Sequence, residues 1–136
     1  MTVLNDVRTY LIASSTLFTA TNLFMGILPE TTFAATALYP TGGVFPLHYF
    51  STSGQTRGYE RPGLQALSRS TSFATAEAHS YAVYTILDGV ANRNLPTTSG
   101  TAYVSIDAVQ QPFLVHRDEN ERFVMGVNFN VVKSTG

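Results

Sequence analysis

A chain of 136 residues has the usual size of one domain, so we expect residues 1–136 to form a single domain around one core. Charged residues make up 12% of the chain, the net charge is −1 and Lys133 is the one lysine, so the clustered cations that bind nucleic acid phosphates are missing. The lack of cysteine excludes disulfides, thiolate zinc sites and a thiol nucleophile.

Two sequence patterns argue against export and membrane insertion. Asp6 and Arg8 interrupt any signal-peptide core at the N-terminus. The longest apolar run, residues 23–28, is far below the roughly 18 residues that span a bilayer, so we expect a soluble protein with no membrane partner.

Threonine and serine replace much of the missing charge, and a neutral hydroxyl surface costs less to desolvate than a charged one. Such a surface fits packing against other subunits, and it fits a threonine-rich monomer equally well.

A helix and a hairpin are predicted in the first 39 residues. Thr2 is a suitable N-cap for a helix that ends near Ser14. Its apolar residues recur on one face: Val3, Leu4, Val7, Tyr10 and Leu11. Residues 21–28 and 32–39 are rich in strand formers, and we expect them to form a hairpin that turns near Pro29.

Residues from about 40 to 60 predict a long loop, because glycine and proline interrupt its apolar pattern repeatedly. Loops of this length inside a domain are usually functional or disordered, and a disordered tract would not carry three aromatic residues in six positions. We expect a neighbouring subunit to cover the apolar residues, with docking on the chain's own domain as the alternative. These residues are Phe45, Leu47, Tyr49 and Phe50.

A strand and the central helix follow. Residues 62–70 predict a strand with Arg61, Gln65 and Arg69 on one side and Leu64 and Ala66 on the other. Residues 71–87 predict a helix that stops at Asp88 and Gly89. Its core-facing stripe consists of Phe73, Ala76, Ser80, Val83, Tyr84 and Leu87.

The C-terminal part predicts a polar loop at 91–101, a strand at 103–109, a bend at 110–112 and a closing hairpin. The final strand, residues 123–131, has one fully apolar face that we expect to cover the helices. A charged turn at 117–121 precedes this strand. The element order indicates an α+β fold, in which an antiparallel or mixed sheet packs against two helices.

Motifs for catalysis or cofactor binding are missing from the sequence. It contains no phosphate-binding loop, no nucleophile elbow and no pair of histidines at metal-ligand spacing, so we expect no enzyme, no cofactor and no metal. His48, His79 and His116 fit packing or surface positions. The remaining alternative is a small hydrolase or ligand-binding domain that uses His116, Asp118 and Glu119.

The arginines outnumber the lysine seven to one. Arginine is the residue type that makes planar bidentate pairs across protein interfaces. We expect some of them to contact other subunits. Pairing of Arg69 with Glu77 or Asp118 inside its own chain is an equal alternative. The polar interface candidates are Arg61, Gln65, Arg69, Arg117, Asp118 and Arg122.

Segments in the chain's order resemble the phage minor capsid and tail terminator family. They are 38–43 (LYPTGG), 61–69 (RPGLQALSR), the helix with Ala76, Tyr84 and Leu87, and 117–129 (RDENERFVMGVNF). The resemblance covers most of the chain from Leu38 onward.

The resemblance implies a structural virion protein of long-tailed phages with no catalytic residue. Such a subunit forms a six-fold ring on the end of the tail tube, stops its elongation and joins the tail to the head connector. The implied partners are its own copies, the tube protein and the connector or stopper protein, with DNA only passing through the bore. The implied location is the tail-neck region of the virion, after assembly in the host cytoplasm. The alternative is another neck, head-completion or minor capsid protein.

Overall fold

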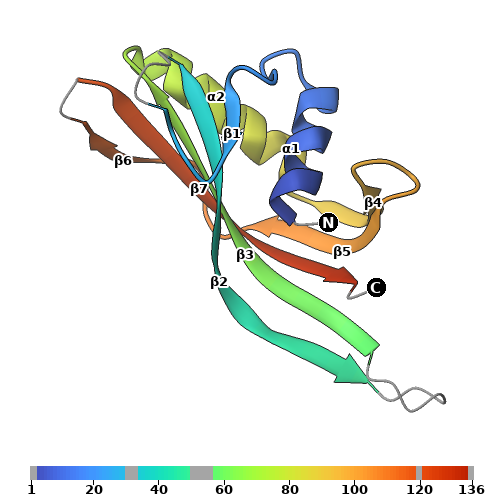
Figure 1. Ribbon diagram of the computed structural model, residues 1–136. Helices are drawn as coiled ribbons and strands as arrows, with labels where there is room; N and C mark the ends of the chain where they lie inside the picture. Colours follow the sequence, from blue (N-terminus) through green and yellow to red (C-terminus); the bar gives the residue numbers. More distant parts are fainter. Residues whose placement is uncertain (1–2, 30–33, 50–56, 119–120, 135–136) are drawn as a thin grey trace.

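The computed structural model describes residues 3–29, 34–49, 57–118 and 121–134, and only the backbone at 44–49 and 57–58. The elements are α1 (Val3–Ser14), β1 (Leu23–Met25), β2 (Ala35–Tyr49), β3 (Arg57–Ser70), α2 (Phe73–Leu87), β4 (Val90–Leu95), β5 (Thr101–Ala108), β6 (Phe113–Arg117) and β7 (Phe123–Ser134). The strands form one mixed sheet in the order β1-β2-β3-β7-β5-β4, and β6 also pairs with β7 (Figure 1). The α+β fold with two helices and one sheet is confirmed, although the sheet is larger than predicted.

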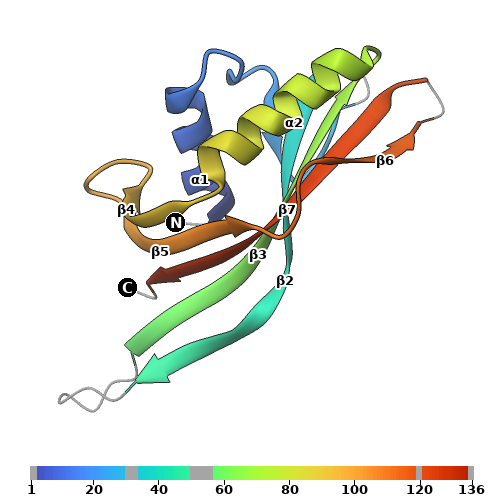
Figure 2. The ribbon, with the colours of Figure 1, turned by 180° about the vertical axis from the view of Figure 1, so that it is seen from behind.

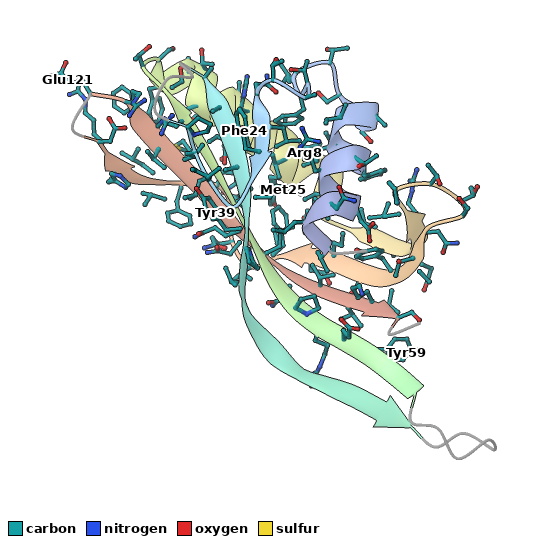
Figure 3. The ribbon with its side chains drawn as sticks, in the orientation of Figure 1. Arg8, Phe24, Met25, Tyr39, Tyr59 and Glu121 are labelled. Carbon is teal, nitrogen blue, oxygen red and sulfur yellow. The ribbon has the colours of Figure 1, made fainter. Side chains whose placement is uncertain are left out.

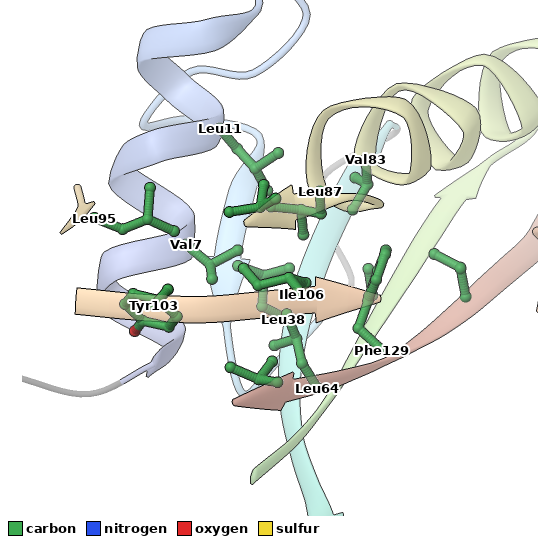
Figure 4. Packing of buried hydrophobic residues seen from close by; sticks show 14 of the residues in the cluster. Val7, Leu11, Leu38, Leu64, Val83, Leu87, Leu95, Tyr103, Ile106 and Phe129 are labelled. Atoms are coloured by element: carbon green, nitrogen blue, oxygen red, sulfur yellow. The ribbon is translucent and has the colours of Figure 1, made fainter. Parts of the chain in front are cut away.

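Both helices lie on one side of the curled sheet, as the opposite views of Figures 1 and 2 show. The core forms between them and the sheet, with Leu11 from α1, Leu87 from α2 and Phe129 from β7 all fully or nearly fully buried (Figure 4). The predicted apolar face of the last strand is therefore confirmed at its centre, where Val127, Phe129 and Val131 belong to this core.

Helix α2 forms as its sequence predicts. The hydroxyl of Ser72 accepts a hydrogen bond from the Thr75 amide, which caps the N-terminus. At the other end Asp88 is the C-cap, and Gly89 takes a left-handed φ of 89° that ends the helix. Its buried residues are Ala76, Ser80, Val83 and Leu87, which confirms most of the predicted stripe.

Helix α1 is held to the sheet by polar contacts as well as by its apolar face. The buried carboxylate of Asp6 accepts a 2.7 Å hydrogen bond from the hydroxyl of Tyr103 on β5. Its other oxygen, Oδ1, is buried and has no hydrogen-bond partner. Arg8 donates from Nε to the carbonyl of Leu23 at 2.8 Å, which links α1 to the start of β1.

The predicted hairpin near Pro29 is wrong, because β1 and β2 pair in parallel. Leu23 lies opposite Thr36, and Met25 lies opposite Leu38. Gly26, with a φ of 79°, directs the chain out of β1 directly after Met25. A strand that leaves its ladder so early cannot continue into a tight antiparallel turn.

The predicted loop at 40–60 is also wrong over its described part, where β2 and β3 form a long antiparallel hairpin. Its outer portion extends away from the helices (Figure 1). We call residues 41–49 and 57–63 the arm. Register shifts fall between Thr41 and Val44 and between Val44 and Leu47, so bulges accommodate the glycine and proline residues that broke the sequence pattern.

The two glycine-containing motifs of the sequence pair with each other at the base of the arm. Thr41 lies opposite Gly63, and a Cβ on Gly63 would lie 2.0 Å from the Thr41 hydroxyl oxygen. A Cβ on Gly43 would lie 2.0 Å from the carbonyl oxygen of Arg61. The two backbones therefore approach so closely at Gly43 that glycine is required there, whereas a side chain at position 63 would displace the Thr41 hydroxyl.

The polar segment at 91–101 was predicted to be a loop, and this is wrong for most of its length. Strand β4 pairs antiparallel with β5, with Leu95 opposite Thr101. Only Val90 and Leu95 of β4 are buried, and the four residues between them are exposed. Because β4 is at the end of the sheet, its polar residues face solvent, and this removes the alternation that marks a strand.

Candidate assembly surfaces

The most apolar exposed strand in the described chain is β6. All five of its residues are exposed, and Phe113, Leu114 and Val115 retain 39%, 49% and 41% of their accessible surface. Val109, which precedes the strand, is 57% exposed. We call these four residues the β6 patch. An exposed apolar strand with one paired neighbour is a typical site of contact with another protein.

The β6 patch continues onto the side of the sheet opposite the helices. Phe113 lies opposite Gly126 in the ladder. A Cβ on Gly126 would meet Val115 Cγ2 at 2.9 Å and Leu67 Cδ2 at 3.1 Å, so these side chains cover the glycine. Leu67 thus joins β3 to the β6 patch. The sequence signal for this surface is the apolar run at 113–115, directly before His116, whereas the predicted contacts lie in the adjacent charged turn.

A second exposed apolar surface lies at the β1 end of the sheet. Met25, which Figure 3 labels, is 42% exposed, and Ile27 is 62% exposed. We call Met25 and Ile27 the β1 patch. Since β2, β3 and β7 stand between β1 and β6, the two patches lie on opposite sides of the sheet's central strands.

The polar candidates on β3 share one side, as predicted, with Arg61 and Gln65 partly exposed. Leu64 and Ala66 point the other way into the core. Arg69 is only 5% exposed, and its guanidinium donates to the carbonyl of Pro29. Arg69 therefore holds part of its own chain, and an interface role for the three residues on this side stays a prediction.

Two other candidates hold the closing turn together. Nε of Arg122 lies 2.8 Å from Asp118 Oδ2, and the Arg122 amide donates to Asp118 Oδ1 at 2.9 Å. The Arg122 side chain is 7% exposed and that of Asp118 is 18% exposed. The turn also places Glu121 at a φ of 60°. This pair therefore orders the hairpin and leaves little of either side chain for a partner.

Arg117 is the exposed cation of the same turn. Its guanidinium lies 5.1 Å from the centre of the Phe123 ring and its Nη2 is 3.7 Å from Glu121 Oε2. Phe123 in turn meets Phe73 at the start of α2, edge to face, at 5.6 Å. Arg117 thus has a packed stem and an accessible charge, which fits a contact surface.

The apolar candidates of the arm are placed only by their backbones. Leu47 lies opposite Tyr59 and Tyr49 opposite Arg57, while Phe45 belongs to the bulged part of β2. Their side chains, and all of Phe50, lie outside the described residues. Their interface role stays a prediction.

Groups that could support chemistry are dispersed in the described part of the chain. His79 packs edge to face on Phe18 at 5.8 Å, and burial lowers its pKa. His116 is exposed on β6, Asp118 binds Arg122, and Glu119 lies outside the described residues. No cluster of three acidic or histidine residues that could hold a metal occurs among the described residues.

No helix in the described part of the chain is long and apolar enough to cross a membrane.

Comparisons with known proteins bear on the family and the fold of this chain. A family model described as "Bacteriophage tail terminator protein" matches residues 8–135. A chain of a solved structure titled "Virion of native gene transfer agent (GTA) particle" superposes with a TM-score of 0.62 at 16% identity, over 97% of this chain and 94% of that chain. At this identity the likeness shows the fold. No curated protein matched the sequence.

Proposed function

This chain belongs to the bacteriophage tail terminator family, and we propose that it forms a six-fold ring that caps the end of a tail tube, ends tube elongation and joins the tail to the head connector. The family is a structural component of phage tails, and the superposed chain comes from a virion. The proposed site of action is the tail-neck region, reached by assembly in the host cytoplasm.

One observation carries the ring proposal. The exposed apolar surfaces at β1 and β6 are unlike each other and lie on opposite sides of the central strands. A ring needs a heterologous contact, in which one surface of each copy meets a different surface of the next copy. Two unlike apolar surfaces meet this need, whereas a single one would favour a two-fold dimer.

The proposed mechanism is control of assembly by shape. The ring binds the last tube ring more tightly than a further tube subunit does, and its outer surface does not accept another tube subunit. Contact energy comes from burying apolar and neutral polar surface, which fits a chain with 12% charged residues. DNA passes through the bore without specific binding.

The arm and the charged hairpin are proposed to meet the tube and the connector. The arm extends beyond the rest of the sheet (Figure 1), and the hairpin carries the accessible charge of Arg117. The proposed contact residues are Phe45, Leu47, Tyr49, Phe50, Arg61, Gln65 and Arg117, whereas Arg69, Asp118 and Arg122 bind groups of their own chain and support these surfaces from within.

The test adds this protein to the polymerising tail tube protein of its own phage and measures tube length by electron microscopy. We expect shorter tubes, each with one cap at one end, and a native mass of six copies for the capping species. Tubes of unchanged length without bound protein would contradict capping. Immunogold labelling of virions separates the alternatives, because a head-completion protein labels the head vertex when tails are absent.

A further inference from the structure

We propose that, in the ring, the β6 patch of one copy packs against the β1 patch of the next copy. The inference rests on the proposed ring and names the surfaces that form it. It also assigns a role to Phe113, Leu114 and Val115, which are exposed in the single chain.

The arrangement of the patches favours a second copy of this chain as the occupant. The β6 patch and the β1 patch belong to one sheet, so a contact between them repeats with the same rotation at every copy. Both patches consist of uncharged residues. The whole chain carries a net charge of only −1, so adjacent copies repel each other weakly.

The area of the β6 patch agrees with one subunit contact. At 39% to 57% exposure its four residues present on the order of 300 Å² of apolar surface, with a phenylalanine side chain taken as about 200 Å² and the aliphatic ones as less. Phe113 and Val115 lie on one face of β6 and Leu114 on the other, so a partner buries this area by wrapping around the strand. A standard interface buries about 800 Å² on each partner and has an apolar core inside a polar rim. The β6 patch therefore has the size of such a core, and polar neighbours such as His116 and Gln111 supply a rim.

The part of β2 that continues past the last residue paired with β1 is less suited to pairing with a strand of the next copy. The Thr36 amide donates to Asn22, and the Leu38 carbonyl accepts from Gly26, so even-numbered residues of β2 point their backbone groups to the β1 side. No register shift occurs before Thr41, so the nitrogen of Pro40 points to the same side and has no hydrogen to donate. Proline at this point blocks the addition of a strand, which leaves the β1 patch as the contact on this side.

The first test uses cysteines, which the natural chain lacks. Virions are prepared with Ile27→Cys, Val115→Cys or both, and treated with a short bismaleimide. A linker between the two positions of one chain leaves that chain a monomer, so only a contact between copies yields multimers. We expect covalent multimers up to six copies from the double variant, and monomers from each single variant.

Four other outcomes would overturn the proposal. Dimers from Val115→Cys alone would show that two β6 patches meet each other. Cross-links from β6 to the tube protein or the connector would assign the patch to another partner. Six-copy rings in the native mass with no cross-link in the double variant would disprove this contact and leave the proposed function standing, whereas the absence of rings would disprove both.

The second test compares two valines. Val115→Lys places a charge in the β6 patch, and Val104→Lys places one on β5, where Val104 is 36% exposed outside the patch. We expect Val115→Lys to reduce incorporation into virions at least ten-fold, Val104→Lys to leave it within two-fold, and both to unfold at the temperature of the natural chain. Equal incorporation of the two folded variants would overturn the proposal.

Discussion

At the scale of single residues, the bond between Tyr103 and Asp6 is the most sensitive polar contact of the core. Both side chains are buried, and the Tyr103 hydroxyl donates to Asp6 Oδ2 at 2.7 Å. Tyr103→Phe removes the donor to Asp6 Oδ2, so both oxygens of this buried carboxyl group then lack a hydrogen-bond partner. We therefore expect a loss of roughly 1–3 kcal/mol in the free energy of unfolding, measured in urea. Asp6→Asn should cost less, because its amide oxygen still accepts from Tyr103. An equal loss in both variants would contradict this account.

Because of Tyr103, we also expect the free energy of unfolding to depend on pH in the alkaline range. Burial, together with the hydrogen bond to Asp6, raises the pKa of Tyr103 above its ordinary value of 10.0. Above about pH 10 the unfolded chain loses this proton and the folded chain keeps it, so the free energy of unfolding falls as pH rises. Urea titrations between about pH 9 and pH 11 should show a shallower fall of this free energy in Tyr103→Phe. Tyr39 contributes to the fall that remains, because burial also raises the pKa of Tyr39. Parallel curves for the two proteins would refute the assignment.

The closing turn offers a comparison of two ion pairs in one hairpin. Asp118→Ala leaves the buried guanidinium of Arg122 without the carboxylate it binds at 2.8 Å, and we expect a loss of about 3 kcal/mol in the free energy of unfolding. Glu121→Ala removes a partner that is 80% exposed and 3.7 Å from Arg117, and should leave stability unchanged within error. Thermal unfolding of both variants tests this, and similar melting temperatures would contradict it.

At the scale of elements, the arm depends on close contact between β2 and β3. Gly43→Ala places a Cβ against the carbonyl of Arg61, so we expect a loss of about 1–3 kcal/mol in the free energy of unfolding. Gly42→Ala is the matched control, because a Cβ there meets no atom within 4 Å, and it should be neutral or slightly stabilising. Hydrogen exchange of the β2 and β3 amides should accelerate in the first variant only. Acceleration in both would contradict the packing described here.

Sequence periodicity predicted the elements whose burial alternates regularly. The helix at 71–87 and the apolar face of β7 follow directly from the 3.6-residue and two-residue repeats. It failed where a strand is bulged, as in β2, or exposed at the end of the sheet, as in β4. Glycine and proline in β2 looked like loop signals, and only the pairing with β3 shows that Gly43 permits close backbone approach and that bulges interrupt the ladder.

Candidate contact residues were harder to predict than elements, because residue type does not reveal burial. Arg69 and Arg122 looked like interface residues, but they are 5% and 6% exposed and bind groups of their own chain. Phe113 and Leu114 were not among the predicted contact residues, and they are exposed because β6 pairs with β7 at the end of the sheet. The family resemblance from the short motifs was confirmed over residues 8–135.

At the scale of the whole molecule, two helices and a curled sheet share one core and leave four exposed features. They are the β1 patch, the β6 patch, the arm and the charged hairpin with Arg117. In the proposed ring the first two meet neighbouring copies, and the arm projects away from the helices (Figure 1). The division is consistent with a subunit that contacts its own copies through the sheet and other tail proteins through the arm.

The most direct test of the central proposal is the length of tails made by phage that lack this protein. Capping predicts tubes of widely varying length, many longer than in the natural phage, that fail to join heads, with normal length restored when the protein is supplied in trans. Electron micrographs that show tails of normal, uniform length in its absence would contradict the account.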